Sequence, residues 1–186
     1  MDTRVDHALV AIRACRPSAG ASRVVAVDGP GGAGKSTLAA FLAGCLGAET
    51  VHTDDFASWD DPIGWWPRLV EELLEPLADG RRARFTPTSW DGVPRDDIVV
   101  EPAELVILEG VTSSRAAFQP FLAYSIWIET PRELRLARGL ERDGESMRAQ
   151  WEAWMALEDR YIEEERPAER ADLVLPGNQD LWEGLP

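Results

Sequence analysis

One segment decides the fold of this 186-residue chain: Gly29-Pro30-Gly31-Gly32-Ala33-Gly34-Lys35-Ser36-Thr37. It matches the spacing G-x-x-x-x-G-K-[ST], in which small residues let backbone N–H groups turn inward around phosphate oxygens. Lys35 is also the only lysine in the chain, which otherwise contains eighteen arginines. We therefore expect a nucleotide-binding loop in which Lys35 reaches the β- and γ-phosphates and the Ser36 hydroxyl ligates Mg²⁺. The residues expected to contact the nucleotide are Gly29, Gly31, Gly32, Ala33, Gly34, Lys35, Ser36 and Thr37.

The segments on both sides of this loop have the patterns of a strand and a helix. Residues 23–28 form a short β-branched run, as in a buried parallel strand, and residues 36–43 are helical with the N-terminus facing the anion. Strands that alternate with helices predict a three-layer α/β/α sandwich with a central parallel sheet. Further strands are expected at 49–53, 84–86, 105–110, 125–129 and 172–176, and helices at 5–15, 63–77, 131–142 and 147–165.

Composition limits the domain count and the kind of partner. A chain of 186 residues with 45% hydrophobic content suits one domain, 1–186, in which residues of about 132–148 form a small helical lid. The formal charge of −14 argues against nucleic acid or an anionic membrane as a main partner. The sequence has no apolar run near ~20 residues and no signal-peptide pattern, so we expect a cytoplasmic protein. Its oligomeric state stays open, with a homodimer as one option.

Acidic side chains follow two of the predicted strands. Asp54 and Asp55 come just after residues 49–53, and Glu109 ends the apolar run 105–109. Ligands of parallel sheets bind at the carboxyl ends of strands, so these carboxylates are expected near the nucleotide. Asp54 could accept a proton from a hydroxyl and meet Mg²⁺ through water, whereas Asp55 better suits a turn cap. The predicted metal contacts are Ser36, Asp54 and Glu109.

Four arginines lie on the predicted helix 131–142, and three of them share a face: Arg135, Arg138 and Arg142. Such a stripe could close over a triphosphate. The alternative is a solvated face paired with neighbouring acids.

Aromatic side chains crowd the region after Asp54: Trp59, Trp65, Trp66 and Trp90. They could stack on a planar acceptor, or they could be packing residues. His52, which precedes the carboxylates, suits hydrogen bonding better than acid–base catalysis.

Taken in order, these segments resemble the uridine kinase-like branch of the P-loop kinases, which are P-loop NTPases. The matching pieces are Asp28 to Thr37, Asp54-Asp55-Phe56, Leu108-Glu109-Gly110, Arg135 to Asp143 and Ala171 to Pro176, which together span most of residues 23–176. The resemblance implies ATP and Mg²⁺ as cofactors, Asp54 as the catalytic aspartate, and a small-molecule hydroxyl acceptor. It also implies that Lys35 and Ser36 contact the nucleotide and metal, and that Arg138 and Arg142 are lid arginines.

The acceptor side departs from the family pattern. Uridine kinases usually place a tyrosine just after the D-x-F element, where this chain has Ala57. Their Tyr-Asp segment with histidine and arginine is replaced by residues 90–95, Trp-Asp-Gly-Val-Pro-Arg. We expect a nucleoside or nucleoside-like acceptor rather than plain uridine. The residues expected to contact it are Asp54, Phe56, Trp59, Trp90 and Arg95.

Two alternatives stay open. A nucleoside monophosphate kinase would need cations for the acceptor phosphate, and candidates are Arg68, Arg81, Arg82, Arg84, Arg95 and Arg115. A nucleotide-dependent switch with little turnover is the other. The guanine signature N-K-x-D of GTPase switches cannot occur here, because the only lysine is in the phosphate loop.

Overall fold

The strand that precedes the phosphate loop lies at the centre of a five-stranded sheet. The computed structural model describes residues 3–58, 61–90 and 92–177. Its main sheet has the order β2-β5-β1-β6-β7, and every neighbouring pair is parallel. The strands are β1 (Arg23–Asp28), β2 (Glu49–His52), β5 (Leu105–Glu109), β6 (Leu122–Glu129) and β7 (Leu173–Pro176).

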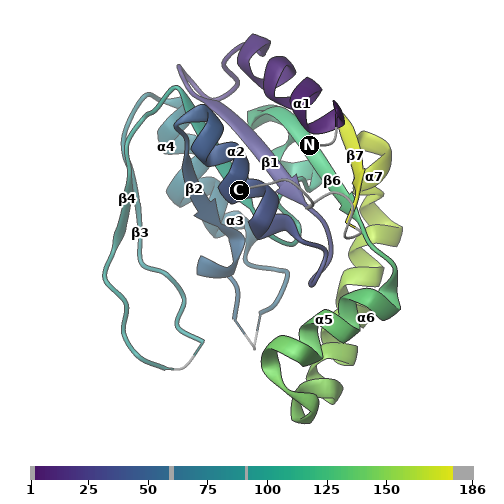
Figure 1. Cartoon of the computed structure of the whole chain (residues 1–186). Helices are drawn as coiled ribbons and strands as arrows, with labels where there is room; N and C mark the ends of the chain where they lie inside the picture. Colours follow the sequence, from purple (N-terminus) through teal and green to yellow (C-terminus); the bar gives the residue numbers. More distant parts are fainter. Residues whose placement is uncertain (1–2, 59–60, 91, 178–186) are drawn as a thin grey trace.

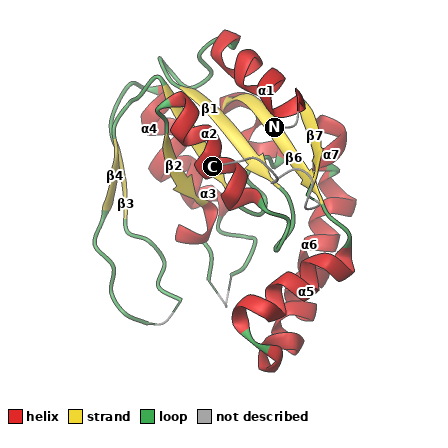
Figure 2. Cartoon of the chain, in the orientation of Figure 1, coloured by secondary structure: helices red, strands yellow, loops and turns green. Residues whose placement is uncertain are grey.

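Helices cover both faces of this sheet (Figure 2). On one face, Val25 and Val27 of β1 belong to the core formed with α1 (Thr3–Ala14) and α2 (Lys35–Leu46). On the other, Val24 packs in the core formed with the helical segment 66–78. Successive strand residues point to opposite faces, so an uninterrupted apolar strand serves both cores. The predicted three-layer α/β fold is therefore confirmed. No helix in the described ranges is long and apolar enough to cross a membrane.

Two structures flank the carboxyl ends of the strands. Figure 1 shows helices on one side and a β-hairpin with a long loop on the other. The hairpin pairs β3 (Ala83–Phe85) with β4 (Ile98–Val100) in antiparallel register. The helices are α5 (Arg132–Asp143), a short turn η4 (Glu145–Met147), α6 (Arg148–Glu165) and α7 (Pro167–Arg170). The short turn η1 (Thr53–Asp55) follows β2, and the turn η3 (Ala116–Phe121) precedes β6.

The helix expected at 63–77 differs from the prediction. It starts at Trp66, with Pro67 in its first turn, and consists of α3 (Trp66–Leu69), the π-helical turn η2 (Val70–Leu74) and α4 (Glu75–Ala78). Proline lacks an N–H and crowds the carbonyl four residues earlier, so Pro76 opposes a regular α-helix through this region. The wider π turn lies directly before it and is one of the recognised local adjustments in helices.

A buried carboxylate ties three parts of the chain together. Asp28, at the end of β1, is fully buried. Its Oδ1 accepts from the backbone N–H groups of Gly29 at 2.7 Å and Thr112 at 2.9 Å. Its Oδ2 accepts from the N–H of Ser114 at 2.9 Å, from the Ser114 hydroxyl at 2.7 Å and from the Tyr161 hydroxyl at 2.7 Å. Asp28 thus joins the phosphate loop to the loop after β5 and to α6.

These bonds offset two local costs. Burial raises the pKa of Asp28, and the hydrogen bonds from Ser114 and Tyr161 oppose that shift. Thr112 has a φ of 67°, a left-handed conformation that is uncommon for a β-branched residue and costs about 1–2 kcal/mol. The Thr112 N–H bond to Asp28 helps to hold the residue there.

We predict that Tyr161→Phe lowers the free energy of unfolding by about 1–3 kcal/mol, the range for losing a hydrogen bond to a buried carboxyl group. Urea denaturation measures the change. Tyr124→Phe is the matched control, because Tyr124 is half-buried and its hydroxyl makes no hydrogen bond within the described ranges. We expect the control to change stability by less than about 0.5 kcal/mol. Equal effects in the two variants would contradict the role of Asp28.

Candidate active site

The phosphate loop has the backbone geometry of an anion cradle. Gly32 and Gly34 have φ values of 75° and 101°, which favour glycine. Helix α2 begins at Lys35, so the N–H groups of its first turn, including that of Ser36, have no acceptor within the helix. The Lys35 ammonium folds back over the loop and donates to the Pro30 carbonyl at 3.1 Å. These groups fit the polyphosphate of a nucleotide.

Glu109 connects the end of β5 to two neighbouring elements. The Ser36 hydroxyl donates to its Oε1 at 3.1 Å, and His52 Nδ1 lies 2.6 Å from its Oε2. Desolvation would raise the pKa of Glu109, but the His52 bond and the charge of Lys35 lead the effects that leave it below its ordinary value. The bond to Glu109 is also the main cause that raises the pKa of His52. His52 therefore has the hydrogen-bonding contact that the sequence favoured.

Asp54 lies in η1, directly after β2. Asp54 is exposed to solvent at the edge of the sheet. Partial desolvation is the first cause that raises the pKa of Asp54, and the charge of Glu109 adds to it. The charges of Lys35 and Arg142 act in the opposite direction, which places both cations within electrostatic reach of Asp54. A raised pKa suits a carboxylate that accepts a proton from a hydroxyl.

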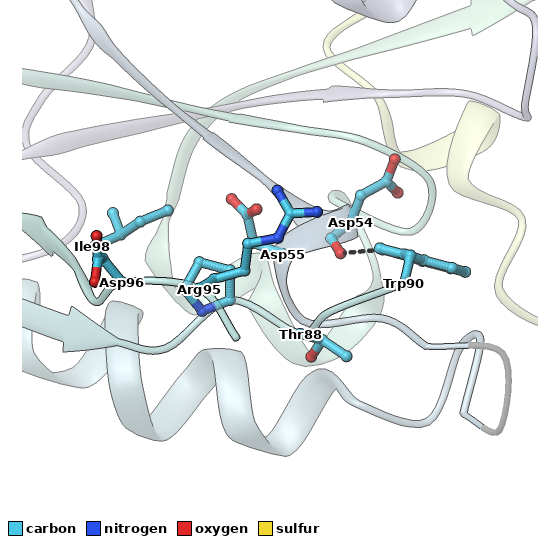
Figure 3. A pocket seen from close by; sticks show the side chains of 8 residues that line it. Asp54, Asp55, Thr88, Trp90, Arg95, Asp96 and Ile98 are labelled. Atoms are coloured by element: carbon cyan, nitrogen blue, oxygen red, sulfur yellow. Dashed lines mark hydrogen bonds between the residues drawn. The ribbon is translucent and has the colours of Figure 1, made fainter. Parts of the chain in front are cut away.

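A cavity of about 350 Å³ opens beside Asp54 (Figure 3). Trp90 donates its indole N–H to the Asp54 carbonyl at 3.0 Å, and the guanidinium of Arg95 points toward Asp55. Three residues that the sequence assigned to the acceptor, Asp54, Trp90 and Arg95, therefore line one cavity. Its full lining is Asp54, Asp55, Pro87, Thr88, Trp90, Arg95, Asp96 and Ile98.

Phe56, which the sequence assigned to the acceptor, lies in the hydrophobic core instead of the cavity lining. Only 3% of Phe56 is exposed, and its ring centroid lies 4.5 Å from that of Phe85 and 6.1 Å from that of Trp65. The Arg68 guanidinium covers the ring at 5.2 Å. Phe56 anchors η1 in the core, because the chain turns there and apolar side chains from the hairpin and the helical segment 66–78 surround it. Trp59, which was also assigned to the acceptor, lies outside the described residues.

The arginines of α5 have different surroundings. Arg135 is buried and donates to Glu158 at 2.9 Å, and Arg132 pairs with Asp159 on the same helix α6. Arg138 donates to the carbonyls of Gly32 at 3.2 Å and Gly177 at 2.8 Å. Arg135 and Arg138 therefore contact α6 and the phosphate loop, whereas the side chain of Arg142 is 71% exposed to solvent.

Arg142 is the stripe arginine that lies within electrostatic reach of Asp54. It bonds to Asp143 at 2.8 and 2.9 Å and lies 5.6 Å above the Trp151 ring. Arg138, by contrast, contacts the loop backbone, so the two predicted lid arginines occupy distinct positions.

No sequence pattern marks Glu158 of α6 as a site residue. Its Oε1 accepts the backbone N–H of Gly31, inside the phosphate loop, at 2.7 Å. Helix α6 carries several glutamates, and nothing in their spacing marks this one, because the contact depends on how α6 packs against a loop 127 residues earlier.

Comparison with known proteins places this geometry in a fold class. No family model matches the chain, and neither does any curated protein. A solved structure described as a possible uridine kinase from Bacillus stearothermophilus superimposes with a TM-score of 0.68 at 22% identity, over 94% of this chain and 100% of that one. A protein described provisionally as a fructose transport system kinase, from Silicibacter sp., gives 0.61 at 23% identity, over 83% and 90%. D-glycerate 3-kinase from Cryptococcus neoformans gives 0.51 at 17% identity, over 85% and 83%.

These identities are low, so the likeness concerns the fold. The chain shares the α/β fold of these three solved structures, as the alternation of its predicted strands and helices indicated.

We predict that Lys35→Ala weakens binding of Mg²⁺–ATP by about 10- to 100-fold, the effect of losing one hydrogen bond to a charged group. Isothermal titration calorimetry measures it. Arg132→Ala removes a cation from the neighbouring α5 and should bind ATP as the original protein does. Unchanged affinity of Lys35→Ala for Mg²⁺–ATP would contradict the assignment of residues 29–37 as a nucleotide-binding loop.

Proposed function

We propose that this protein is an ATP- and Mg²⁺-dependent phosphotransferase that phosphorylates a hydroxyl of a small molecule, a nucleoside or nucleoside-like metabolite. The observation that carries the proposal is the position of Asp54. Asp54 follows β2 at the sheet edge where the phosphate loop follows β1, and it also lines the adjacent cavity. A single carboxylate can therefore act on an acceptor that lies in the cavity and faces the nucleotide.

The oxygen atoms beside the phosphate loop fit Mg²⁺. This ion takes oxygen ligands and normally uses one or two carboxylates together with phosphate oxygens and water. The Ser36 hydroxyl and the Glu109 carboxylate, which are 3.1 Å apart, would hold it with Asp54 acting directly or through water. When bound, the ion neutralises charge that develops on the phosphate oxygens.

The protein groups have distinct tasks in the transfer. Lys35 holds the β- and γ-phosphates, and Arg142 offsets charge on the migrating phosphoryl group. Asp54 orients the acceptor hydroxyl and accepts its proton. The hydroxyl oxygen forms the new bond to the γ-phosphorus, and the bond from that phosphorus to the bridging oxygen of ADP breaks.

The charges around the cavity favour an acceptor without a phosphate. Its lining contains three carboxylates, Asp54, Asp55 and Asp96, against one guanidinium, Arg95. Most arginines that a monophosphate kinase could have used are held in ion pairs: Arg68 with Glu72, Arg81 with Asp79, Arg82 with Glu101, Arg84 with Asp97, and Arg115 with Glu165. Of these, Arg68 also donates to the hydroxyl of Thr88 in the cavity lining at 3.1 Å. A dianionic acceptor would thus meet net negative charge.

Two observations support a hydroxyl acceptor with a planar ring. Proteins with this fold include ones described as kinases of uridine and D-glycerate, whose acceptors carry hydroxyl groups. Trp90 also brings an aromatic ring to the edge of the cavity. Ala57 is buried, with 2% exposed, and does not line the cavity. The acceptor side is formed instead by the hairpin loop that carries Trp90 and Arg95.

A screen for ADP release across nucleosides, nucleoside monophosphates and sugar alcohols tests the proposal. We expect release that depends on an added nucleoside-like hydroxyl compound. Strong turnover with a monophosphate, lost on changing Arg95, would favour a nucleotide kinase. Hydrolysis without any acceptor, or none at all, would favour a nucleotide-dependent switch.

We predict that Asp54→Asn lowers kcat by about 10²–10⁴-fold, the usual contribution of a general base, while ATP affinity changes by only a few-fold. Asp55→Asn is the matched control, since it removes the same charge from the next residue and should have a smaller effect. Steady-state kinetics with the acceptor found in the screen measure both. A larger effect of Asp55→Asn would move the base by one residue.

We predict different kinetic effects for the two lid arginines. Arg142→Ala should lower kcat more than it weakens ATP binding, because its charge acts beside Asp54. Arg138→Ala should mainly weaken ATP binding, because Arg138 holds the loop backbone at Gly32. Separate measurements of kcat and ATP affinity distinguish the two. Identical profiles for both variants would contradict this division.

A further inference from the structure

Glu158 makes a buried, fully polar contact with the phosphate loop. It has no exposed surface. Its Oε1 accepts from the N–H of Gly31 at 2.7 Å and from the indole N–H of Trp154 at 2.6 Å. Its Oε2 accepts from Arg135 at 2.9 Å. One carboxylate therefore joins the phosphate loop, α5 and α6.

The contact with Gly31 is made at close range. A Cβ atom at Gly31 would lie 2.9 Å from the Glu158 carboxylate and 3.1 Å from the Trp151 ring, so a larger residue there would displace the Glu158 side chain from its present position. The Gly31 N–H is turned toward α6, whereas the N–H groups of Lys35 and Ser36 open at the start of α2. Glu158 thus holds the loop from the side of α6 and leaves the start of α2 open to phosphate.

A second set of contacts leads from Glu158 to the acceptor side. The ring of Trp154, whose N–H bonds Glu158, lies 6.0 Å from the ring of Trp90 at an interplanar angle of 59°. Trp90 in turn donates to the Asp54 carbonyl at 3.0 Å. Contacts are therefore continuous from Gly31 through Glu158, Trp154 and Trp90 to Asp54.

Stability alone gives a weak reason for this arrangement. Burial raises the pKa of Glu158. The hydrogen bond from the Gly31 N–H and the charges of Lys35 and Arg135 act against this rise. A buried ion pair often stabilises a protein no more than an apolar replacement of the same shape. The carboxylate instead fixes the relative positions of three elements, because it accepts hydrogen bonds from a donor on each of them at once.

We propose that Glu158 is a positioning residue for phosphoryl transfer. Through Gly31 it fixes the phosphate loop, and through Trp154 and Trp90 it fixes the segment that carries Asp54. The proposal rests on the phosphotransferase function proposed above. It assigns α6 the task of keeping the nucleotide and the general base in one geometry, in which small displacements of reacting groups have large effects on rate.

Two variants of Glu158 separate positioning from charge. Glu158→Ala removes every acceptor and should lower kcat/KM by about 10²-fold. Glu158→Gln retains an oxygen for Gly31 and Trp154, and should recover at least about tenfold of that loss by the same geometric reasoning. ATP affinity, measured by calorimetry, should fall in Glu158→Ala and be largely kept in Glu158→Gln.

Glu165→Ala is the matched control. Glu165 lies on the same helix and accepts from Arg115 at 3.2 Å and from the Ala116 N–H at 2.6 Å, but it has no contact with the phosphate loop within the described ranges. It should lose stability and keep kcat/KM. All variants are assayed at a temperature where circular dichroism shows each to be folded. If Glu158→Ala does not fold, Trp154→Phe replaces it, since it loses the N–H bond to Glu158 and should lower kcat several-fold.

A double-mutant cycle tests the link to Asp54. Trp90→Phe keeps a ring and loses the N–H bond to the Asp54 carbonyl. Trp90 and Glu158 are connected through Trp154, so their effects on kcat should deviate from additivity by more than about threefold. Additive effects would overturn the link.

Two further outcomes would overturn the proposal. One is that Glu158→Ala has the same kcat and ATP affinity as the unmodified protein. The other is tighter ATP binding in both Glu158 variants, which would mean that the carboxylate competes with phosphate. Lys35→Ala separates this failure from that of the function: if it keeps full acceptor-dependent turnover, the phosphotransferase assignment fails, whatever Glu158 does.

Discussion

The parallel pairing of β1 and β2 with β5 is the constraint on which the site depends. In this register Glu109 lies opposite both Val27 and His52, so the three strands end together at one edge. The phosphate loop follows β1, Asp54 follows β2, and Glu109 ends β5. A register shift of one residue would turn every side chain of a strand to the opposite face. Such a shift would also move Glu109 out of register with Val27 and His52, so the strand pairing sets the alignment of the polar groups at the strand ends.

The sequence could predict features that depend on local pattern. The phosphate-loop spacing, the β-branched runs and the order of the elements indicated the sheet and the edge at which Asp54 and Glu109 both lie. It could not predict features that depend on distant packing. Phe56 follows two carboxylates like a site residue, but its neighbours in space, Phe85 and Trp65, place it in the core. Strand β4 forms by pairing with β3, and the role of Glu158 arises from its contact with a loop 127 residues away.

Charge at the site is balanced locally in a protein of formal charge −14. The only lysine and Arg142 both act on the carboxyl group of Asp54, while Glu109 is matched by His52. Arg135 neutralises Glu158 behind the loop. Polyphosphate recognition in our account thus depends on short-range donors, namely a helix N-terminus, an ammonium and a guanidinium, because the long-range field of the protein repels anions.

The most direct test follows the γ-phosphoryl group itself. The purified protein is incubated with a nucleoside acceptor and with Mg²⁺–ATP that carries ¹⁸O in the γ-phosphate. Mass spectrometry then identifies and quantifies the products. We predict equal amounts of ADP and of a phosphorylated acceptor that carries the labelled phosphoryl group on its hydroxyl oxygen. Release of the label only as free phosphate, at a rate that no acceptor changes, would contradict this prediction.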